Sequence, residues 1–187
     1  MSLTKNKILK QFDTYTESND YQNILSEKLS LELISDLHSE FIIKWRNKPD
    51  NLSLFINNKK LTLSDQQRFL KDYWLRDRID LVLKFEQLPI GVFSLTGLNS
   101  TKVYLGKLMG DTDFRGKGFS FKSSISLLNY AFNFLKIKEV FALTKVSNKP
   151  NISLNKKIGF KVLETIKVDD EDFYLMNICK ESFNCVV

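Results

Sequence analysis

The stretch GDTDFRGKGFSFKSS (residues 110–124) decides the fold, because its RGKG segment places two glycines and two cations directly before a long apolar run. That run, residues 119–137, repeats its apolar side chains at helical spacing. A glycine-rich turn that opens a helix leaves backbone N–H groups free, and the helix dipole adds partial positive charge there. The stretch therefore predicts a phosphate site at a helix N-terminus, with Arg115 and Lys117 adding charge.

Two familiar phosphate motifs do not fit this turn. A P-loop has four residues between its glycines, followed by Lys and Ser or Thr. Here five residues separate Gly110 from Gly116, and Lys117 is followed by Gly118. The dinucleotide fingerprint requires a further glycine three residues after Gly118, where this chain has Phe121. Both motifs are excluded.

The rest of the chain reads as one α/β domain with a mixed sheet, spanning residues 1–187. Apolar residues make up 43% of its 187 positions, which is enough for a packed core. The chain shows no linker, repeat or low-complexity tract, and residues 1–20 are expected to be loosely ordered or to form a peripheral strand. Patterning predicts helices over 30–47 (capped by Ser30), 61–76 (capped by Ser64, with Trp74 on its apolar side), 119–137 and 151–159 (ended by Gly159), and strands over 21–29, 80–86, 90–98, 102–110, 139–146, 160–168 and 172–180.

Charge and cysteine content narrow the function classes. The net charge of +6 favours anionic ligands, although a solvated lysine-rich surface would give the same number. No Lys/Arg block is long enough for a nucleic-acid tail, and there is no aromatic-basic stripe, so no nucleic-acid partner is expected. Cys179 and Cys185 suggest neither a disulfide framework nor a metal clip. Without a signal peptide or an apolar span, we expect a cytoplasmic protein with no membrane partner.

The single histidine, His38, excludes further chemistry. A zinc site with two histidine ligands is impossible, and a Ser-His-Asp triad would have to use His38. Because His38 falls in a predicted helix, we expect an ordinary, partly exposed side chain and no metal site.

A third phosphate motif does fit the turn. Residues 115–120 (RGKGFS) resemble the R/Q-x-x-G-x-G/A signature of the GNAT superfamily of N-acetyltransferases, which cradles the pyrophosphate of acetyl-coenzyme A; Ser120 replaces the final small residue. Downstream, Asn148 and residues 152–160 resemble the family's next motif, N-x-x-[AS]-I-x-L-x-x-K-x-G-F. The resemblance covers residues 21–180. It implies a mostly antiparallel mixed sheet, flanked by helices, with a splayed central pair of strands.

The resemblance also implies how acetyl-coenzyme A is held and used. Backbone groups of Leu108, Met109 and Gly110 would bind the pantetheine arm and polarise the thioester carbonyl. The acceptor amine would attack directly, without an acyl-enzyme or a metal. Asn148 would touch the pantetheine or the helix start, or be a simple cap. The pyrophosphate would lie on the N–H groups of Arg115, Gly116, Lys117, Gly118, Phe119 and Ser120, and Asn151 and Asn155 would complete the cofactor site.

The acid and the base of the reaction stay open at this point. Many relatives carry a tyrosine that protonates the departing thiolate where this chain has Asn155, and an amide is a poor acid. Either another group serves as the acid, with Tyr104 and Tyr130 as candidates that could equally be core residues, or the thiolate leaves without direct help. The base that deprotonates the amine has three surface carboxylates as candidates, or a water chain: Asp111, Asp113 and Glu86.

The upstream segments FIIKWRNKPDN and LTLSDQQRFLKD resemble two branches of the family. These are the ribosomal-protein N-terminal acetyltransferases and the sugar-nucleotide N-acetyltransferases of the pseudaminic-acid pathway. The second branch implies that Trp45, Arg46 and Asn47 line an acceptor pocket, with Arg46 pairing with a nucleotide phosphate. Alternatively, Trp45 packs the first helix and Arg46 is a surface residue.

We therefore expect acetyl transfer from acetyl-coenzyme A to a primary amine, specifically an amino group on a nucleotide-linked sugar. Two alternatives remain: an acetyltransferase for protein N-termini or small-molecule and antibiotic amines, and a non-catalytic module that binds acetyl-coenzyme A. The protein would act as a monomer or a homodimer.

Overall fold

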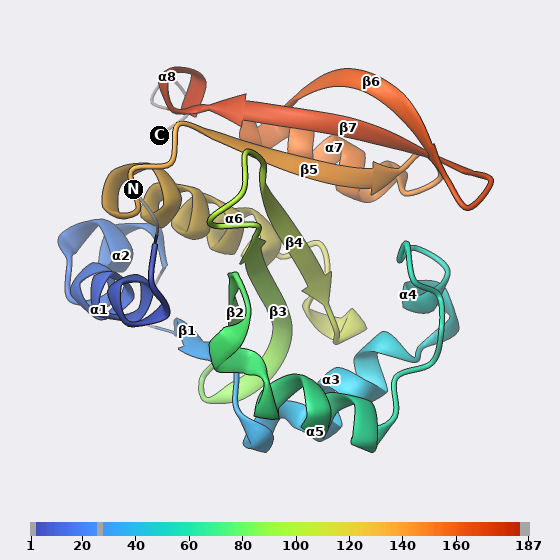
Figure 1. Cartoon of the computed structure of the whole chain (residues 1–187), viewed down its shortest axis with the longest axis horizontal. Coiled ribbons are helices and arrows are strands. Elements are labelled where there is room, and N and C mark those ends of the chain that lie inside the picture. The colour runs from blue at the N-terminus through green and yellow to red at the C-terminus, as the bar shows by residue number, and fades with distance from the viewer. Residues whose placement is uncertain (1–2, 26–27, 184–187) are drawn as a thin grey trace.

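The computed structural model describes residues 3–25 and 28–183. In this part of the chain, seven strands form one sheet in the order β1-β2-β3-β4-β5-β7-β6, and every neighbouring pair except β4–β5 is antiparallel (Figure 1). This mixed, mostly antiparallel sheet confirms the predicted fold class. The strands are β1 (Leu29–Leu33), β2 (Arg78–Phe85), β3 (Leu88–Thr96), β4 (Val103–Met109), β5 (Glu139–Lys145), β6 (Lys161–Val168) and β7 (Glu171–Cys179).

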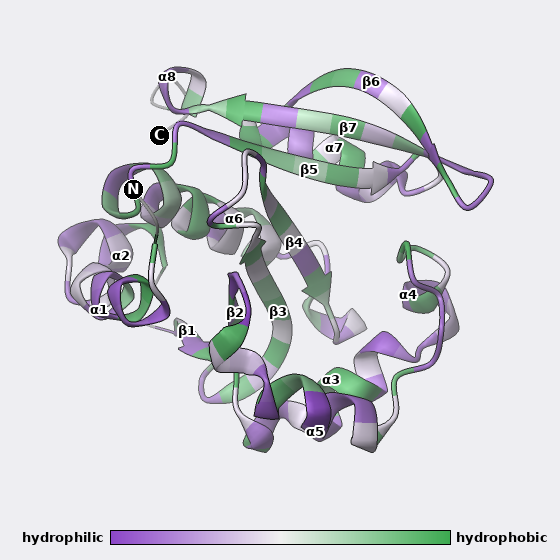
Figure 2. Cartoon of the chain, in the orientation of Figure 1, coloured by the Kyte–Doolittle hydropathy of each residue, from purple (hydrophilic) through white to green (hydrophobic). Residues whose placement is uncertain are grey.

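Helices cover both faces of the sheet. One face carries α6 with α1, α2 and α7, and the other carries α3 and α5. Figure 2 shows the reason, since hydrophobic residues run along β3, β5 and α6. The bounds are α1 (Lys5–Thr16), α2 (Asn19–Ile24), α3 (Ser39–Arg46), α4 (Pro49–Leu52), α5 (Leu63–Lys71), α6 (Phe119–Asn129), α7 (Lys149–Ile158) and α8 (Lys180–Phe183).

The two central strands separate soon after they meet. β4 and β5 pair only through Val103 with Val140 and Tyr104 with Phe141. Beyond this point β4 continues along β3, β5 continues along β7, and the two strands diverge (Figure 1). The predicted splayed pair is thus confirmed, and two strand edges with free backbone groups face each other across a gap.

The N-terminal prediction was wrong. Residues 5–16 form α1, whose Ile8, Phe12 and Tyr15 are buried at helical spacing against the core. The Tyr15 hydroxyl lies 2.7 Å from that of Ser126 on α6, which ties the helix to the domain. Residues 1 and 2 lie outside the described part.

The predicted strand over 21–29 and the start of the helix over 30–47 were also wrong. Residues 19–24 form α2, and the strand begins only at Leu29. Ser30 is therefore a strand residue and not a helix cap. The alternating LSLEL pattern of 29–33 is typical of a strand, but it overlaps the helical spacing that begins at Leu33, and the prediction followed the helical spacing. The helix itself begins at Ser39, after a 3₁₀ turn.

Smaller differences concern helix ends. Thr62 caps α5 instead of Ser64, through a reciprocal pair of bonds with Asp65. Trp74 lies beyond that helix and is 56% exposed. The predicted helix 119–137 is α6 followed by a π-helical segment over 130–134. α7 ends at Gly159, as predicted.

Candidate active site

The glycine turn lies at the open end of the gap between β4 and β5. Gly116 and Gly118 have φ of 76° and 80°, a left-handed backbone that disfavours other residues. A Cβ atom added at either would meet nothing within 4 Å. The glycines are therefore required by backbone conformation, and the space above them is open to a ligand.

The turn presents a row of free donors. Within the described residues, the backbone N–H groups of 116–121 have no acceptor, and the first bond inside α6 runs from the Lys122 N–H to the Gly118 carbonyl, 3.1 Å. The Arg115 N–H is not part of this row, because it donates to the Thr112 carbonyl at 3.1 Å. The donor row predicted from 115 to 120 is thus displaced by one residue and includes Phe121.

The Arg115 side chain holds the end of β4 in place. Its Nη2 donates to Asn51 Oδ1 at 2.7 Å and to the Met109 carbonyl at 3.2 Å. Lys48 Nζ donates to the Gly110 carbonyl at 2.9 Å. Residues on either side of Pro49 therefore clamp the end of the strand, and Lys117 is the free cation of the turn, 5.2 Å from the Phe114 ring.

The direction in which the backbone N–H and C=O groups of β4 point decides which of the predicted pantetheine contacts can form. The Gly110 N–H donates to the Ile90 carbonyl of β3. Because antiparallel ladders alternate, Leu108 also turns its backbone groups toward β3, whereas Lys107 and Met109 turn theirs toward the gap. Of the three predicted residues, Met109 offers its N–H to a ligand in the gap.

Of the predicted acceptor residues, only Trp45 is seen to pack against this end of β4. Trp45 is 3% exposed, and a Cβ atom on Gly110 would overlap its indole ring. Both amide atoms of Asn47 bond the backbone of Leu61 at 2.8 Å. Arg46 lies over the Phe55 ring at 4.5 Å, and burial lowers its pKa. Trp45 thus has the packing role that the sequence left open.

A polar network crosses the narrow part of the gap. Lys107 Nζ of β4 donates to Asn155 Oδ1 of α7. Asn155 is fully buried, and its Nδ2 donates to Thr144 Oγ1 of β5 at 3.1 Å. Asn151 Nδ2 donates to the same hydroxyl at 3.2 Å. The two predicted asparagines are therefore brought together, with a lysine that the sequence analysis missed.

Lys107 is a partly buried cation without a counter-ion in this network. Burial alone lowers the pKa of its ammonium to about 7. The position of Lys107 could have been found from the sequence. Every second residue of β4 (Val103, Leu105 and Met109) lies on the apolar face of the strand, and Lys107 falls in the same series.

The remaining candidates have structural partners. Tyr130 is fully buried, donates to the Ile8 carbonyl at 2.6 Å, and has its pKa raised by burial. Tyr104 lies at the last pairing of β4 with β5, its ring 5.9 Å from that of Phe141. The others act as a turn cap (Asp111, bonded to the Asp113 N–H), an ion pair (Glu86 with Lys28) and a helix cap (Asn148, bonded to the Asn151 N–H).

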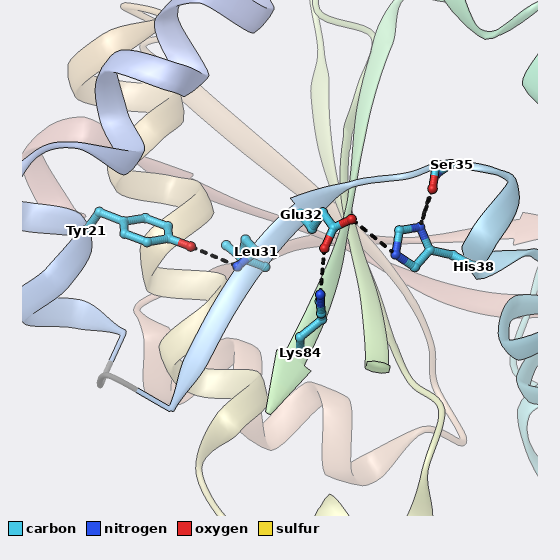
Figure 3. A network of polar contacts seen from close by, with 6 residues as sticks. All are labelled: Tyr21, Leu31, Glu32, Ser35, His38 and Lys84. Carbon is cyan, nitrogen blue, oxygen red and sulfur yellow. Dashed lines mark hydrogen bonds and ion pairs between the residues drawn. The ribbon is translucent and has the colours of Figure 1, made fainter. Parts of the chain in front are cut away.

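His38 lies away from the gap, with β2 and β3 between β1 and β4. Contrary to expectation it is buried, 3% exposed. Its Nδ1 accepts the Ser35 N–H at 3.1 Å, and Glu32, which also pairs with Lys84 at 2.8 Å, faces its Nε2 at 3.7 Å (Figure 3). Burial lowers its pKa. The histidine thus stabilises the turn that follows β1.

The gap fits the chemistry of acetyl-coenzyme A. The free N–H row and Lys117 suit a pyrophosphate, and the unpaired edge of β4 suits the amide groups of a pantetheine arm. In the described residues, no cluster of three or more His, Cys, Asp or Glu side chains could hold a metal ion. None of the helices described has the length and apolar character needed to cross a bilayer.

Solved structures share this architecture. An aminoglycoside acetyltransferase, AAC(6')-Ib, in complex with coenzyme A superposes with a TM-score of 0.73 at 19% identity, over 84% of this chain and 98% of that one. Spermidine N-acetyltransferase from Vibrio cholerae, in complex with coenzyme A and spermine, gives 0.75 at 17% identity, over 85% and 99%. An uncharacterized protein from Bacillus halodurans gives 0.74 at 15% identity, over 84% and 87%.

At such identities the likeness shows the fold, and the family comes from the sequence itself. No curated protein sequence is detectably similar to this chain. Residues 28–161, however, match the model of the acetyltransferase (GNAT) domain. The match spans well over half of the chain and includes the glycine turn, both splayed strands and α7. The chain therefore belongs to the GNAT acetyltransferase family, as an N-acetyltransferase that uses acetyl-coenzyme A.

Proposed function

We propose that the pyrophosphate of acetyl-coenzyme A binds the N–H row of residues 116–121, with Lys117 beside it. The pantetheine arm then follows the free edge of β4 past Met109 toward the point where the strands meet. The free donors support this placement, because within the described residues they have no other acceptor. The open space above both glycines supports it as well.

In this arrangement the chain's own groups position the reaction. The acceptor nitrogen attacks the thioester carbonyl, a C–N bond forms, and the C–S bond breaks. A backbone N–H group of β4 that faces the gap, at Lys107 or at Met109, stabilises the negative charge that develops on the carbonyl oxygen. The strand holds this donor rigidly, so no reorganisation is needed as the charge appears.

We propose that the acceptor is a small molecule with a primary amine, specifically an amino sugar linked to a nucleotide. Arg46 carries this proposal. Its Nε is buried without a hydrogen-bond partner among the described residues, and its Nη2 reaches only the Asn57 carbonyl at 3.4 Å. A partly buried guanidinium with an unpartnered Nε is suited to a phosphate. Arg46 also follows Trp45, which packs on the end of β4.

The test is thiol release from acetyl-coenzyme A with purified protein and separate acceptors: UDP- and dTDP-linked amino sugars, spermidine, kanamycin and short peptides. The proposal expects turnover with an amino-sugar nucleotide. The variant Arg46→Gln should raise the KM for the amino-sugar nucleotide about 10- to 100-fold, which is the loss expected for a charged hydrogen bond. The KM for acetyl-coenzyme A should not change. Lys44→Gln, on the exposed side of α3, is the matched control.

Other outcomes are equally informative. The neighbouring structures include enzymes named for aminoglycosides and spermidine. Turnover with kanamycin or spermidine alone would keep the small-molecule amine and overturn the nucleotide. Turnover with peptides alone would move the chain to the protein N-terminal class. Binding of acetyl-coenzyme A without turnover on any acceptor would favour a binding module.

A further inference from the structure

The narrow part of the gap contains a cation, Lys107, that has no ion pair among the described residues. Lys107 lies in the stretch of β4 that no longer pairs with β5, and its side chain points to the face that carries α6 and α7. The chain Lys107–Asn155–Thr144 then runs from β4 through α7 to β5. The ammonium therefore lies between the two diverging strands, beside the path proposed for the thioester.

The surroundings of Lys107 are neutral on every side that the structure describes. Asn155 accepts its hydrogen bond, Thr144 stands behind that amide, and the Phe160 ring lies 5.9 Å from Nζ. No carboxylate contributes to its pKa, which burial alone sets to about 7. A structural lysine would be expected to have an ion pair or an exposed ammonium. Among the described residues Lys107 has no ion pair, and its ammonium is instead bonded to the fully buried amide of Asn155.

We propose that Lys107 is the general acid of the reaction and gives a proton to the sulfur as the C–S bond breaks. This rests on the cofactor placement proposed above. It also resolves the role of Asn155. The amide cannot donate a proton itself, but its Oδ1 accepts a hydrogen bond from the ammonium and so fixes its position, while its own Nδ2 is fixed by Thr144. Lys107 is the catalytic residue and Asn155 is its positioning residue.

The proton balance of the step is complete. The nitrogen of the acceptor forms the C–N bond with its lone pair, and the electrons of the C–S bond pass to sulfur. A proton moves from Lys107 Nζ to that sulfur, which leaves coenzyme A as a thiol and Lys107 as a neutral amine. The acylated nitrogen loses one proton to solvent, and Lys107 regains one from solvent. No oxidant, reductant or further reactant is needed.

The decisive experiment measures the thiol of bound coenzyme A, independently of any acceptor. Coenzyme A is titrated into wild-type protein by calorimetry, and the thiolate of the complex is followed by ultraviolet absorbance from pH 5 to 10. An ammonium within reach of sulfur favours the thiolate. Because Lys107 with a pKa of about 7 and the thiol titrate as a coupled pair, we expect the thiolate absorbance of the wild-type complex to begin at a lower pH than that of the Lys107→Met complex.

Turnover completes the test once an acceptor from the panel is known. Lys107→Met should lower kcat roughly 10²- to 10⁴-fold, the usual contribution of a positioned acid, while the Kd of coenzyme A changes less than about threefold. Lys107→Arg should keep the low thiol pKa and still turn over slowly, because a guanidinium stays protonated. The exposed Lys102, just before β4, gives the control Lys102→Met, which should change neither quantity.

Each failure points to a different proposal. If the wild type does not bind coenzyme A, or if Gly118→Glu binds it normally, the cofactor placement fails. If coenzyme A binds but its thiol pKa is the same in wild type and Lys107→Met, the role of Lys107 is overturned. Full activity of Lys107→Arg would overturn proton donation. Lys107→Gln, which keeps a neutral donor toward Asn155, provides a second comparison if the methionine variant does not fold.

Discussion

The two ends of the gap between β4 and β5 are proposed to bind their partners by opposite means. At the open end, several backbone N–H groups of 116–121 share the work, two glycines keep side chains away, and the cation Lys117 is exposed. At the narrow end, the single side chain of Lys107 is aimed by the fully buried Asn155. Many shared donors suit a fixed charge such as phosphate, whereas proton transfer requires one group with a shifted pKa.

The largest effect is expected from charge at the open end. Gly118→Glu places a carboxylate where the pyrophosphate is proposed to lie, and should weaken acetyl-coenzyme A binding at least about 100-fold by calorimetry. Gly118→Asn is the control, because asparagine tolerates a φ of 80° and brings no charge. Equal loss of affinity in both folded variants would mean that backbone conformation, and not charge, controls the affinity for acetyl-coenzyme A at this end.

The narrow end should appear in the pH dependence of stability. The pKa of Lys107 is about 7 in the folded protein, against an ordinary value of 10.5, so the unfolded chain binds more protons between these limits. The free energy of unfolding should therefore rise with pH from about 7 to 10, by about 2 kcal/mol from this residue, roughly half of the full shift. Lys5, with a pKa of about 8, acts in the same direction.

Comparison with a variant isolates the contribution of Lys107. We would measure the free energy of unfolding of wild type and Lys107→Met in urea at pH 6 and at pH 10. The free energy of unfolding of the variant, relative to that of the wild type, should be higher at pH 6 than at pH 10. Lys5 contributes equally to both proteins and cancels. A constant difference between the two proteins across this range would contradict a depressed pKa at Lys107.

The support under the open end can be broken by one methyl group. Gly110→Ala would push a Cβ atom into the Trp45 indole, and should lower the free energy of unfolding by about 2 kcal/mol, as overpacking does. Ala at Gly106, where the added atom meets the movable Ser94 hydroxyl, should cost less. Thermal unfolding of both variants measures the difference, and equal losses would argue against a rigid indole support.

The smallest expected change concerns the electrostatics of the narrow end. Asn155→Asp keeps the shape of the side chain and sets a carboxylate against Lys107 Nζ. An opposite charge at this distance favours the ammonium, so the pKa of Lys107 should rise by about one or more. A side-chain NMR titration of lysine in the unliganded variant and wild type gives both values. An unchanged pKa would mean that the two side chains are not in contact in solution.

The sequence predicted some elements well and others poorly, for physical reasons. The turn, α6 and the end of α7 at Gly159 followed from local pattern, and the splayed strands followed from the family resemblance. α1 was not predicted, although Ile8, Phe12 and Tyr15 have helical spacing, because most of the residues between them are polar and the segment as a whole resembles a loop. β1 was missed because its leucines also begin a helical pattern.

In the site, the sequence alone determined the parts that depend on neighbours in the chain. A left-handed glycine turn and a free helix N-terminus require only residues 115–121, so their positions were predictable to within one residue. The tertiary structure decided the rest. Lys107 and Asn155 are 48 residues apart, and His38 and Trp45 are buried by elements distant in sequence. Burial and hydrogen-bond partners arise only when the strands, α3 and α7 pack, and these set both the pKa of Lys107 and the direction in which it points.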